Sequence, residues 1–269
     1  MNFQDKSAFI SIVGRPNAGK SSLLNRMLGQ KIAIVSDKPQ TTRTRIMGVL
    51  TEGEHQLVFT DTPGMHKPKT SLGNYMVRSV KESVSSADAC LLVVEAGREP
   101  DETENALIKR ISEMGIPAVL AINKTDLLKQ KEELMHLILT YSSMFDFEAI
   151  VPLSARTGDG VPALVEELKK LTSEGGHFFE EDTLTDQSER VLASEMIREK
   201  LLRNLDKEIP HGTAVIVEKM KQRLASIDID GLLSPASVEE YVTGSRSTAF
   251  PLGLCSFLIS SIDLLKVSN

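Results

Sequence analysis

The chain alternates short continuous apolar stretches with longer amphipathic ones. The apolar stretches are residues 9–13, 57–59, 89–94, 118–122 and 149–153. The amphipathic stretches are residues 22–28, 72–84, 103–114, 131–141 and 161–171. The first set is rich in Val, Ile and Leu, which is typical of parallel strands covered on both faces, and the second has helical length and spacing. The alternation predicts a doubly wound α/β sheet, in which ligands bind at the carboxyl ends of the strands.

One pair of strands breaks this alternation. Residues 46–51 and 56–60 are joined by only four residues, 52–55, which include Gly53. Two strand-like runs this close together are typical of a hairpin. The sequence therefore predicts a mostly parallel sheet with one antiparallel strand.

Length and composition limit the possible classes of protein. A chain of 269 residues is long for one domain, so a second, smaller unit is expected. The net charge of −6 means that any basic surface for nucleic acid has to be local. Cys90 and Cys255 lack metal-ligand spacing and are expected to be packing residues in a reducing compartment. The first seven residues lack an apolar signal core, and no uncharged apolar run reaches the roughly 18 residues of a membrane span, so a cytoplasmic location is predicted.

Residues 14–21, Gly-Arg-Pro-Asn-Ala-Gly-Lys-Ser, lie between a predicted strand and a predicted helix. They match the phosphate-loop pattern G-x-x-x-x-G-K-[ST], in which backbone N–H groups and a helix N-terminus surround phosphates. Lys20 can reach the β/γ-phosphate oxygens, and Ser21 can ligate a bridging Mg²⁺. The expected phosphate-binding residues are Gly14, Arg15, Pro16, Asn17, Ala18, Gly19, Lys20, Ser21 and Ser22.

Three more motifs follow predicted strands of the same sheet and should lie on the same rim. The further candidate nucleotide contacts are Asp61, Thr62, Pro63 and Gly64, then Asn123, Lys124, Thr125 and Asp126, then Ser154, Ala155 and Arg156. Asp61 can hold the Mg²⁺ shell through water, and the Gly64 N–H can mark the γ-phosphate. Any one of these motifs alone could be a turn that matches by chance. The probability that all of them occur by chance in this order and context is negligible.

The motif at residues 123–126, Asn-Lys-Thr-Asp, predicts selectivity for guanine. Asp126 can accept hydrogen bonds from the N1–H and the exocyclic amine of guanine, whereas adenine offers neither. Sites that leave a buried polar group unpaired with the wrong ligand discriminate by roughly 10⁴-fold or more. Asn123 and Lys124 are expected to brace the base and the phosphate loop, and Ser154 with Ala155 to close over the guanine O6 edge.

With these motifs in this order, the sequence resembles GTPases of the translation-factor-related class, and more narrowly the Era family within the TrmE-Era-EngA-YihA-Septin-like group. Residues 40–43, Gln-Thr-Thr-Arg, match that family's first switch, in which a threonine is the second Mg²⁺ ligand; Thr42 is favoured, with Thr41 as the alternative. Asn17 matches an asparagine that helps to hold K⁺ in related GTPases, or is a loop residue bonded to its own backbone. The resemblance implies GTP or GDP with Mg²⁺, and K⁺ near Asn17.

The candidate catalytic residues are Lys20, Thr42 and Gly64, which would stabilise charge on the γ-phosphoryl group. Met65 stands close to where Ras-like enzymes place a water-positioning glutamine, and a thioether cannot orient water in this way. His66 lies among loop-forming neighbours and is interpreted as a switch-loop residue instead of a base. Slow intrinsic hydrolysis is therefore expected.

The resemblance continues through a glycine-containing hinge into a second unit, for which it implies an RNA-binding KH domain that contacts small-subunit ribosomal RNA. The expected organisation is a GTPase domain (1–172), a linker (173–189), a partial α+β KH-like domain (190–230) and an atypical tail (231–269). Residues 190–223 carry eight Lys or Arg against five Asp or Glu, which suits RNA in part, although such a helix is more often a solvated face.

The tail departs from the family. No G-x-x-G loop, with which KH folds clamp a nucleic-acid backbone, occurs in residues 226–269, and this segment has two Lys or Arg against five Asp or Glu. One hypothesis is an end replaced by a shifted reading frame. The KH-like domain is therefore expected to be incomplete.

Together these features predict a GTP-binding, slowly hydrolysing switch. The resemblance implies that it binds small-subunit ribosomal RNA, assists 30S assembly, couples to cell growth and division, and contacts the inner face of the membrane peripherally. A monomer is expected. The alternatives are a GTPase of a tRNA-modification system and a nucleotide-binding module that has lost its RNA-binding half.

Overall fold

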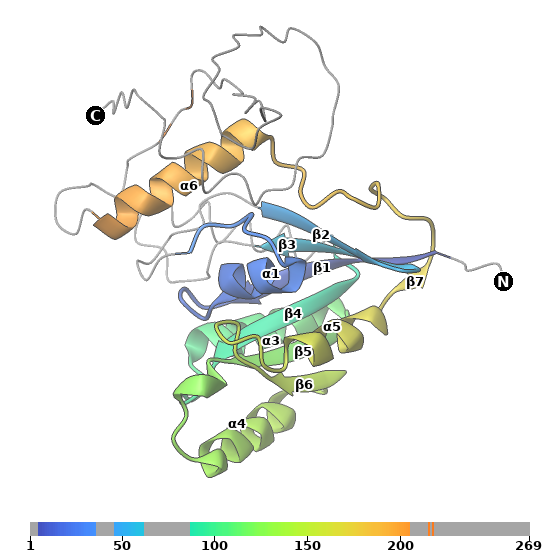
Figure 1. Cartoon of the computed structure of the whole chain (residues 1–269). Coiled ribbons are helices and arrows are strands. Elements are labelled where there is room, and N and C mark those ends of the chain that lie inside the picture. Colours follow the sequence, from blue (N-terminus) through green and yellow to red (C-terminus); the bar gives the residue numbers. More distant parts are fainter. Residues whose placement is uncertain (1–4, 36–45, 62–86, 205–214, 216, 218–269) are drawn as a thin grey trace, which may run out of the picture.

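The computed structural model describes residues 5–35, 46–61, 87–204, 215 and 217 (Figure 1). The predicted helix at 72–84, the first-switch residues 40–43 and the motif residues 62–64 lie outside this described part, as does the segment from residue 218 onward.

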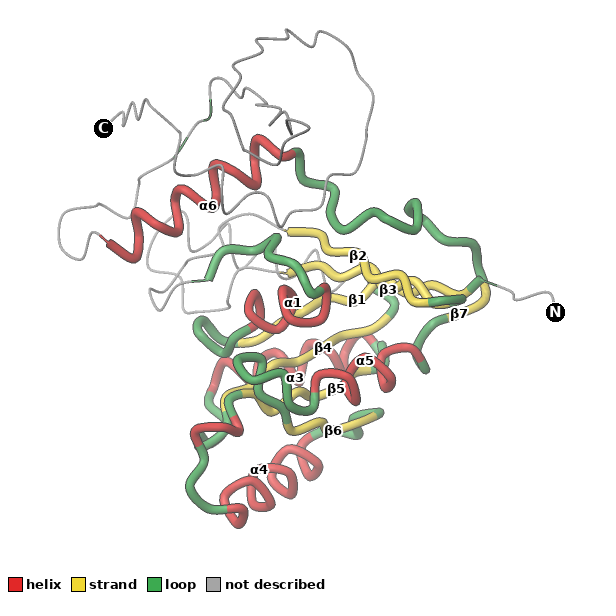
Figure 2. The backbone as a smooth tube through the Cα atoms, in the orientation of Figure 1, coloured by secondary structure: helices red, strands yellow, loops and turns green. Residues whose placement is uncertain are grey.

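A single twisted sheet forms the centre of the molecule (Figure 2). Its main strands are β1 (Lys6–Gly14), β2 (Ile46–Glu52), β3 (His55–Asp61), β4 (Ala89–Glu95), β5 (Ala118–Asn123) and β6 (Ala149–Pro152). They lie in the order β2-β3-β1-β4-β5-β6, and β1 runs parallel to both of its main neighbours, β3 and β4. The predicted doubly wound parallel sheet is confirmed. Its inner strands β4 and β5 are apolar up to their last residues, Glu95 and Asn123, because both faces are covered.

Helices cover both faces of the sheet. Those in the described ranges are α1 (Lys20–Leu28), α3 (Glu102–Met114), α4 (Lys131–Met144), α5 (Val161–Lys169) and α6 (Glu189–Asn204), and a 3₁₀ turn, η1, lies at Thr125–Leu127. Buried residues of α1 and α5 belong to one apolar cluster, and those of α3 and α4 to a second. The predicted helices at 22–28, 103–114, 131–141 and 161–171 are confirmed to within a few residues at their ends, and the one at 72–84 stays a prediction.

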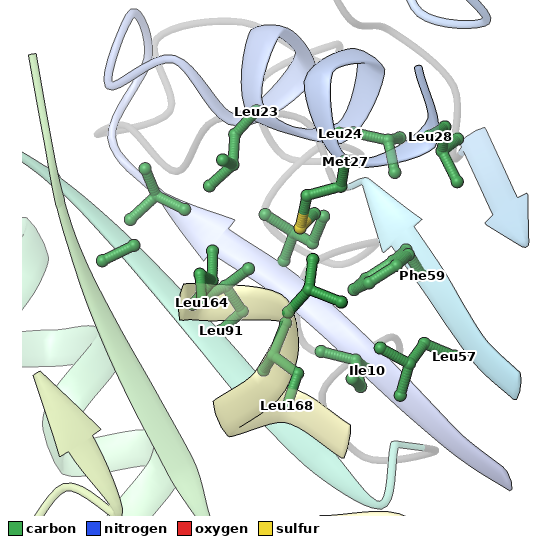
Figure 3. Packing of buried hydrophobic residues seen from close by; sticks show 14 of the residues in the cluster. Ile10, Leu23, Leu24, Met27, Leu28, Leu57, Phe59, Leu91, Leu164 and Leu168 are labelled. Atoms are coloured by element: carbon green, nitrogen blue, oxygen red, sulfur yellow. The ribbon is translucent and has the colours of Figure 1, made fainter. Parts of the chain in front are cut away.

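The larger apolar cluster fixes α1 on the sheet directly behind the phosphate loop (Figure 3). Leu23, Leu24 and Met27 point from α1 toward the sheet, where Ile10 and Phe59 belong to the same cluster, and all five side chains are buried. Because α1 begins at the phosphate loop, this packing also holds the loop in place.

The hairpin of β2 and β3 is confirmed, but it is tighter than predicted. Both strands extend one residue further, so that Glu52 pairs with His55 and only two residues turn the chain. Gly53 takes φ 61°, a conformation that glycine adopts without steric cost.

A second antiparallel pairing was not predicted. Ser173–Glu174 forms the short strand β7, which pairs with Lys6 and Ser7 of β1. β4 covers β1 only from Ile10 to Gly14, which leaves the first part of β1 with an open edge. The expected linker therefore starts as part of the sheet, because an unpaired strand edge offers hydrogen-bonding groups to any nearby extended segment.

α6 contacts the larger apolar cluster and the loop that follows α1. Leu192 is buried in the larger apolar cluster, and Glu199 pairs with Lys31 at 2.6 Å between Oε2 and Nζ.

Within the described part of the chain, no helix combines the length and apolar character needed to cross a membrane. Cys90 is fully buried in β4, and burial raises its thiol pKa to about 12, so its predicted packing role is confirmed; Cys255 lies outside the described residues.

Candidate nucleotide-binding site

The loop between β1 and α1 has a backbone that only glycine allows at two positions. Gly14 has φ 151° and Gly19 has φ 96°. A Cβ on Gly14 would overlap the Val93 carbonyl oxygen, and one on Gly19 would overlap Asn123 Nδ2. The two glycines therefore let the loop lie directly against β4 and β5, at the carboxyl ends of the strands.

Lys20 is buried at the start of α1, and its ammonium group lies inside the curve of the loop. Nζ donates to the carbonyl oxygens of Gly14 (3.2 Å) and Arg15 (2.8 Å). Burial lowers the Lys20 pKa to about 8, opposed by the nearby Asp61 carboxylate. A desolvated cation held by neutral carbonyls is well placed to bind an anion such as phosphate.

Ser21 and Asp61 meet beside this cation. Ser21 Oγ donates to Asp61 Oδ2 at 2.6 Å, and the Asp61 carboxyl group is fully buried. Oδ1 of Asp61 has no hydrogen-bond partner among the described residues. Burial raises the Asp61 pKa, whereas Lys20 and the Ser21 hydrogen bond act to lower it. A hydroxyl next to a carboxylate with an unpaired oxygen is a donor set that suits Mg²⁺, so the residues fit the predicted ion.

Asn123, the last residue of β5, bridges two loops. Its Nδ2 donates to the Ala18 carbonyl oxygen at 2.8 Å, and its Oδ1 accepts from the Ala155 N–H at 2.9 Å. The side chain is buried, so both hydrogen bonds are shielded from water. The hydrogen bond to Ala18 agrees with the expected bracing of the phosphate loop by Asn123, and bracing of the base by Asn123 and Lys124 stays a prediction.

The Asp126 carboxylate is held in a fixed orientation by two residues of the next loop. Oδ1 accepts from Ser154 Oγ at 2.6 Å, and Oδ2 pairs with Arg156 Nη2 at 2.7 Å. The two candidate base-binding motifs are thus brought together, although 28 residues separate Asp126 from Ser154.

Lys124 and Thr125 complete this part of the rim. Lys124 takes the left-handed φ of 68°, and its Nζ lies 3.0 Å from Glu95 Oε1 at the end of β4. The Thr125 N–H donates to the Leu153 carbonyl oxygen at 3.2 Å. Hydrogen bonds and ion pairs therefore connect the ends of β4, β5 and β6.

The side chain of Arg15 turns away from the loop that carries it. Its Nη1 lies 3.3 Å from Asp101 Oδ2 and 4.0 Å from Glu104 Oε1, at the N-terminus of α3. Asp101 and Glu104 form a capping box there, with each side chain bonded to the other residue's backbone. Any Arg15 contact with phosphate is therefore expected from its main chain.

Sequence reasoning missed Arg26. Its Nε donates to the Ala155 carbonyl oxygen at 3.0 Å and its Nη2 donates to the Arg156 carbonyl oxygen. Arg26 lies outside every motif, in an ordinary position of α1, so no local signal marked it. A cavity of about 420 Å³ lies beside this contact, with Ser22 and Lys31 also in its lining.

The described candidate residues gather at one rim, where the ends of β1, β3 and β5 meet the loop after β6. They comprise residues 14–22, Asp61, residues 123–126 and residues 154–156. The remaining candidates, Thr41, Thr42, Thr62, Pro63 and Gly64, lie outside the described residues.

Comparison with known proteins agrees with this geometry. A family model described as "50S ribosome-binding GTPase" matches residues 9–124. GTPase Era of Ruminiclostridium cellulolyticum is 50% identical over 218 residues, which cover 81% of this chain and 73% of that protein. GTPase Era of Clostridioides difficile is 47% identical, with the same coverage of both chains.

The chain belongs to the Era family of GTPases. It is accordingly a GTPase. This assignment favours the Era interpretation over a tRNA-modification GTPase.

Solved Era structures share the fold. A structure of Era in complex with MgGDPNP and nucleotides 1506–1542 of 16S ribosomal RNA has a TM-score of 0.76 and 36% identity, covering 81% of this chain and 74% of that one. A variant of Aquifex aeolicus Era bound to GDP and AlF₄⁻ also has a TM-score of 0.76 and 36% identity, covering 80% and 73%. The Era-type GTPase fold is confirmed.

Proposed function

We propose that this Era-family chain is a GTP-dependent switch that binds small-subunit ribosomal RNA and assists assembly of the 30S subunit. The main support for the nucleotide-binding part of this proposal is the position of the Asn123 side chain. Through Ala18 and Ala155 it joins the phosphate loop to the loop that orients Asp126. One buried amide thus sets the spacing between the two ends of a nucleotide site.

In the proposed site, residues 14–22 surround the phosphates with backbone N–H groups. The Lys20 ammonium group exchanges its carbonyl partners for phosphate oxygens, a charge-assisted and stronger interaction. Ser21 would hold Mg²⁺ directly and Asp61 through water, with Thr42 or Thr41 as the further ligand. Mg²⁺, when bound, neutralises charge on the β- and γ-phosphates.

The base would be recognised at the opposite end of the rim. Asp126 accepts from the N1–H and the exocyclic amine of guanine, in an orientation fixed by Ser154 and Arg156. Lys124 and Thr125 keep this loop against the neighbouring strand ends. A preorganised carboxylate loses little freedom on binding, which favours affinity as well as selectivity.

Isothermal titration calorimetry with GTP and ATP tests the guanine site. The wild-type chain should take up GTP and discriminate against ATP by roughly 10⁴-fold. Asp126→Asn should lose most of this preference and gain affinity for XTP, since xanthine carries a carbonyl in place of the amine and asparagine can donate to it. Asp146→Asn is the matched control on an exposed loop and should keep the wild-type preference. Equal uptake of ATP and GTP by the wild-type chain would refute the site.

Hydrolysis is proposed to be slow without an activator. Unassisted Ras reaches only about 10⁻⁴ s⁻¹ even with its glutamine, and this sequence has Met65 near that position. We also propose that Asn17 contributes to a K⁺ site at the phosphate loop, where it adopts a left-handed φ of 63°. Single-turnover phosphate release, measured in K⁺ and in Na⁺, tests both slow hydrolysis and K⁺ stimulation. Equal rates in the two salts would exclude K⁺ stimulation. An absence of phosphate release in both salts would exclude turnover.

The ribosomal half of the proposal is supported by the Era structure that contains 16S ribosomal RNA. We propose a GTPase domain at residues 1–172, a linker at 173–189, a partial KH-like domain at 190–230 and an atypical tail at 231–269. Within the KH-like part, α6 is the described element. A monomer, a cytoplasmic location and peripheral contact with the membrane stay predictions.

Binding of a 16S 3′-terminal RNA fragment tests this half. A complex driven by phosphate contacts should weaken steeply as salt increases. The measurement is made with GDP and with a non-hydrolysable GTP analogue, because a switch should bind differently in the two states. An absence of salt-sensitive binding in both states would remove the ribosomal function and leave the nucleotide site intact.

A further inference from the structure

Arg26 of α1 binds two consecutive carbonyl groups of the loop after β6. Its Nε donates to Ala155 O at 3.0 Å, and its Nη2 donates to Arg156 O. The guanidinium group is planar with donors in a fixed fork, so it sets the directions of both carbonyls at once. α1 itself is fixed on the sheet by Leu23, Leu24 and Met27, which makes it a rigid support for this contact.

The direction of the Ala155 carbonyl also sets the direction of the next N–H group. In a trans peptide the C=O of one residue and the N–H of the following residue point to opposite sides. With Ala155 O directed at Arg26, the Arg156 N–H points away from α1. The Ala155 N–H is already bonded to Asn123 Oδ1 at 2.9 Å. The Arg156 N–H is therefore the donor of this peptide that can be directed at a ligand.

The two edges of a guanine base need different partners. The N1–H and the exocyclic amine require an acceptor, which Asp126 supplies, whereas O6 requires a donor. The Asp126 carboxylate is hydrogen-bonded to Ser154 and paired with the Arg156 side chain. The carboxylate acceptor and the Arg156 N–H donor therefore lie close to each other in the site.

We infer that Arg26 is a positioning residue for recognition of the purine 6-oxo group. It holds the Ala155–Arg156 peptide so that the Arg156 N–H meets O6, and it acts without touching the nucleotide. The inference rests on the proposed guanine site, and it adds a determinant of base selectivity that lies outside all four nucleotide-binding motifs.

Arg26 is also a surface cation near a polyanionic ligand, and a charge effect has to be separated from positioning. Lys31 provides the matched control, because it lines the same cavity and carries the same charge, but its ammonium group pairs with Glu199 instead of the loop of residues 155 and 156. Removal of either charge should weaken binding of every nucleoside diphosphate by a similar factor. Only removal of Arg26 should change how the 6-position is recognised.

The experiment compares dissociation constants of GDP, 6-thio-GDP and IDP for the wild-type chain and for Arg26→Met, Arg26→Lys and Lys31→Met. Sulfur is a weak acceptor, so the GDP to 6-thio-GDP ratio reports the contact at the 6-position; IDP lacks the amine, so the GDP to IDP ratio reports Asp126. The wild-type chain should prefer GDP over 6-thio-GDP by about tenfold, as expected for one hydrogen bond.

Arg26→Met should bring the GDP to 6-thio-GDP ratio close to one and leave the GDP to IDP ratio unchanged. Arg26→Lys should fall between, and Lys31→Met should keep both wild-type ratios. Thermal unfolding without nucleotide confirms that each variant is folded. The inference is overturned if Arg26→Met keeps the wild-type 6-thio-GDP ratio, or if the wild-type chain does not distinguish GDP from 6-thio-GDP. A wild-type chain that does not prefer GDP over ADP would instead refute the guanine site itself.

Discussion

Gln56 and Phe179 exchange two hydrogen bonds across 123 positions of sequence: the Gln56 Nε2 donates to the Phe179 carbonyl oxygen, and the Phe179 N–H donates to Gln56 Oε1, each at 3.0 Å. The same Oε1 also accepts from the Phe178 N–H at 2.8 Å. Gln56 is fully buried. Its side-chain amide supplies the linker backbone with the hydrogen-bond partners that a neighbouring strand would otherwise provide.

This contact ties the linker to the strand that ends in Asp61. Further along, the Val49 N–H donates to Leu184 O at 2.9 Å, and Thr185 Oγ1 donates to Met47 O at 2.6 Å, so that the linker follows β2 as well. The segment leading to α6 therefore lies along both strands of the hairpin.

Gln56→Ala should release the linker. We expect a loss of about 2 kcal/mol in the free energy of unfolding, because the three hydrogen bonds from the Gln56 side chain to the backbone of residues 178 and 179 are lost. Hydrogen exchange should accelerate at the amides of Phe178 and Phe179, as followed by mass spectrometry. Gln130→Ala, at an exposed position that makes no side-chain cap, should change neither quantity. Unchanged exchange at both amides in Gln56→Ala would mean that other contacts hold the linker.

Asn123→Ala should couple a loss of stability to a loss of nucleotide affinity. The Ala18 carbonyl and the Ala155 N–H would both be left unpaired in a buried site, at a cost of about 2–4 kcal/mol. GTP binding, measured by calorimetry, should weaken by at least about tenfold, since both ends of the site lose their common support. Asn105→Ala, on the exposed face of α3, should stay within about 0.5 kcal/mol of the wild-type stability. Lost stability with unchanged GTP affinity would contradict the bridging role.

Gly19→Ala and Gly29→Ala form a matched pair, because both glycines flank α1 and both have positive φ, 96° and 66°. The added methyl group at position 29 meets nothing within 4 Å, so only the backbone strain of about 1 kcal/mol is expected there. At position 19 it would overlap Asn123 Nδ2 and displace the bridging amide. Urea denaturation should show a clearly larger loss for Gly19→Ala, together with loss of GTP binding. Equal losses in the two variants would exclude the clash.

The Lys20 ammonium group should make stability depend on pH in the alkaline range. Burial lowers its pKa from 10.5 to about 8 in the folded state, so the unfolded chain binds more protons between these two values. Stability without nucleotide should therefore rise with pH across this window. From pH 7.5 to 9.5 the wild-type chain should gain about 2 kcal/mol relative to Lys20→Met, as followed by urea denaturation. A difference between the two proteins that is constant with pH would exclude a lowered pKa.

The sequence predicted the sheet and the chemistry of its rim because both depend on local patterns. Continuous apolar runs such as residues 89–94 favour buried strands in any context, and the glycines of the phosphate loop are required by backbone conformation at those positions. Since parallel strands end at one edge, the convergence of Lys20, Asp61 and Asp126 followed from topology alone. The sequence placed Ser154 at the guanine O6 edge, and the contacts of Asp126 with Ser154 and Arg156 were not predicted.

The contacts that hold this rim together depend on residues far apart in the chain. Arg26 reaches Ala155 across 129 positions, and Gln56 reaches Phe179 across 123. An arginine in a helix and a glutamine in a strand are common as solvated residues, so their local sequence gave no reason to assign them a partner. β7 likewise pairs with β1 only because β4 leaves part of that edge open. Sequence alone determined which groups can bind a guanine nucleotide, since that chemistry resides in short motifs; tertiary structure decided which residues hold those groups in place, since such contacts exist only once distant segments have packed.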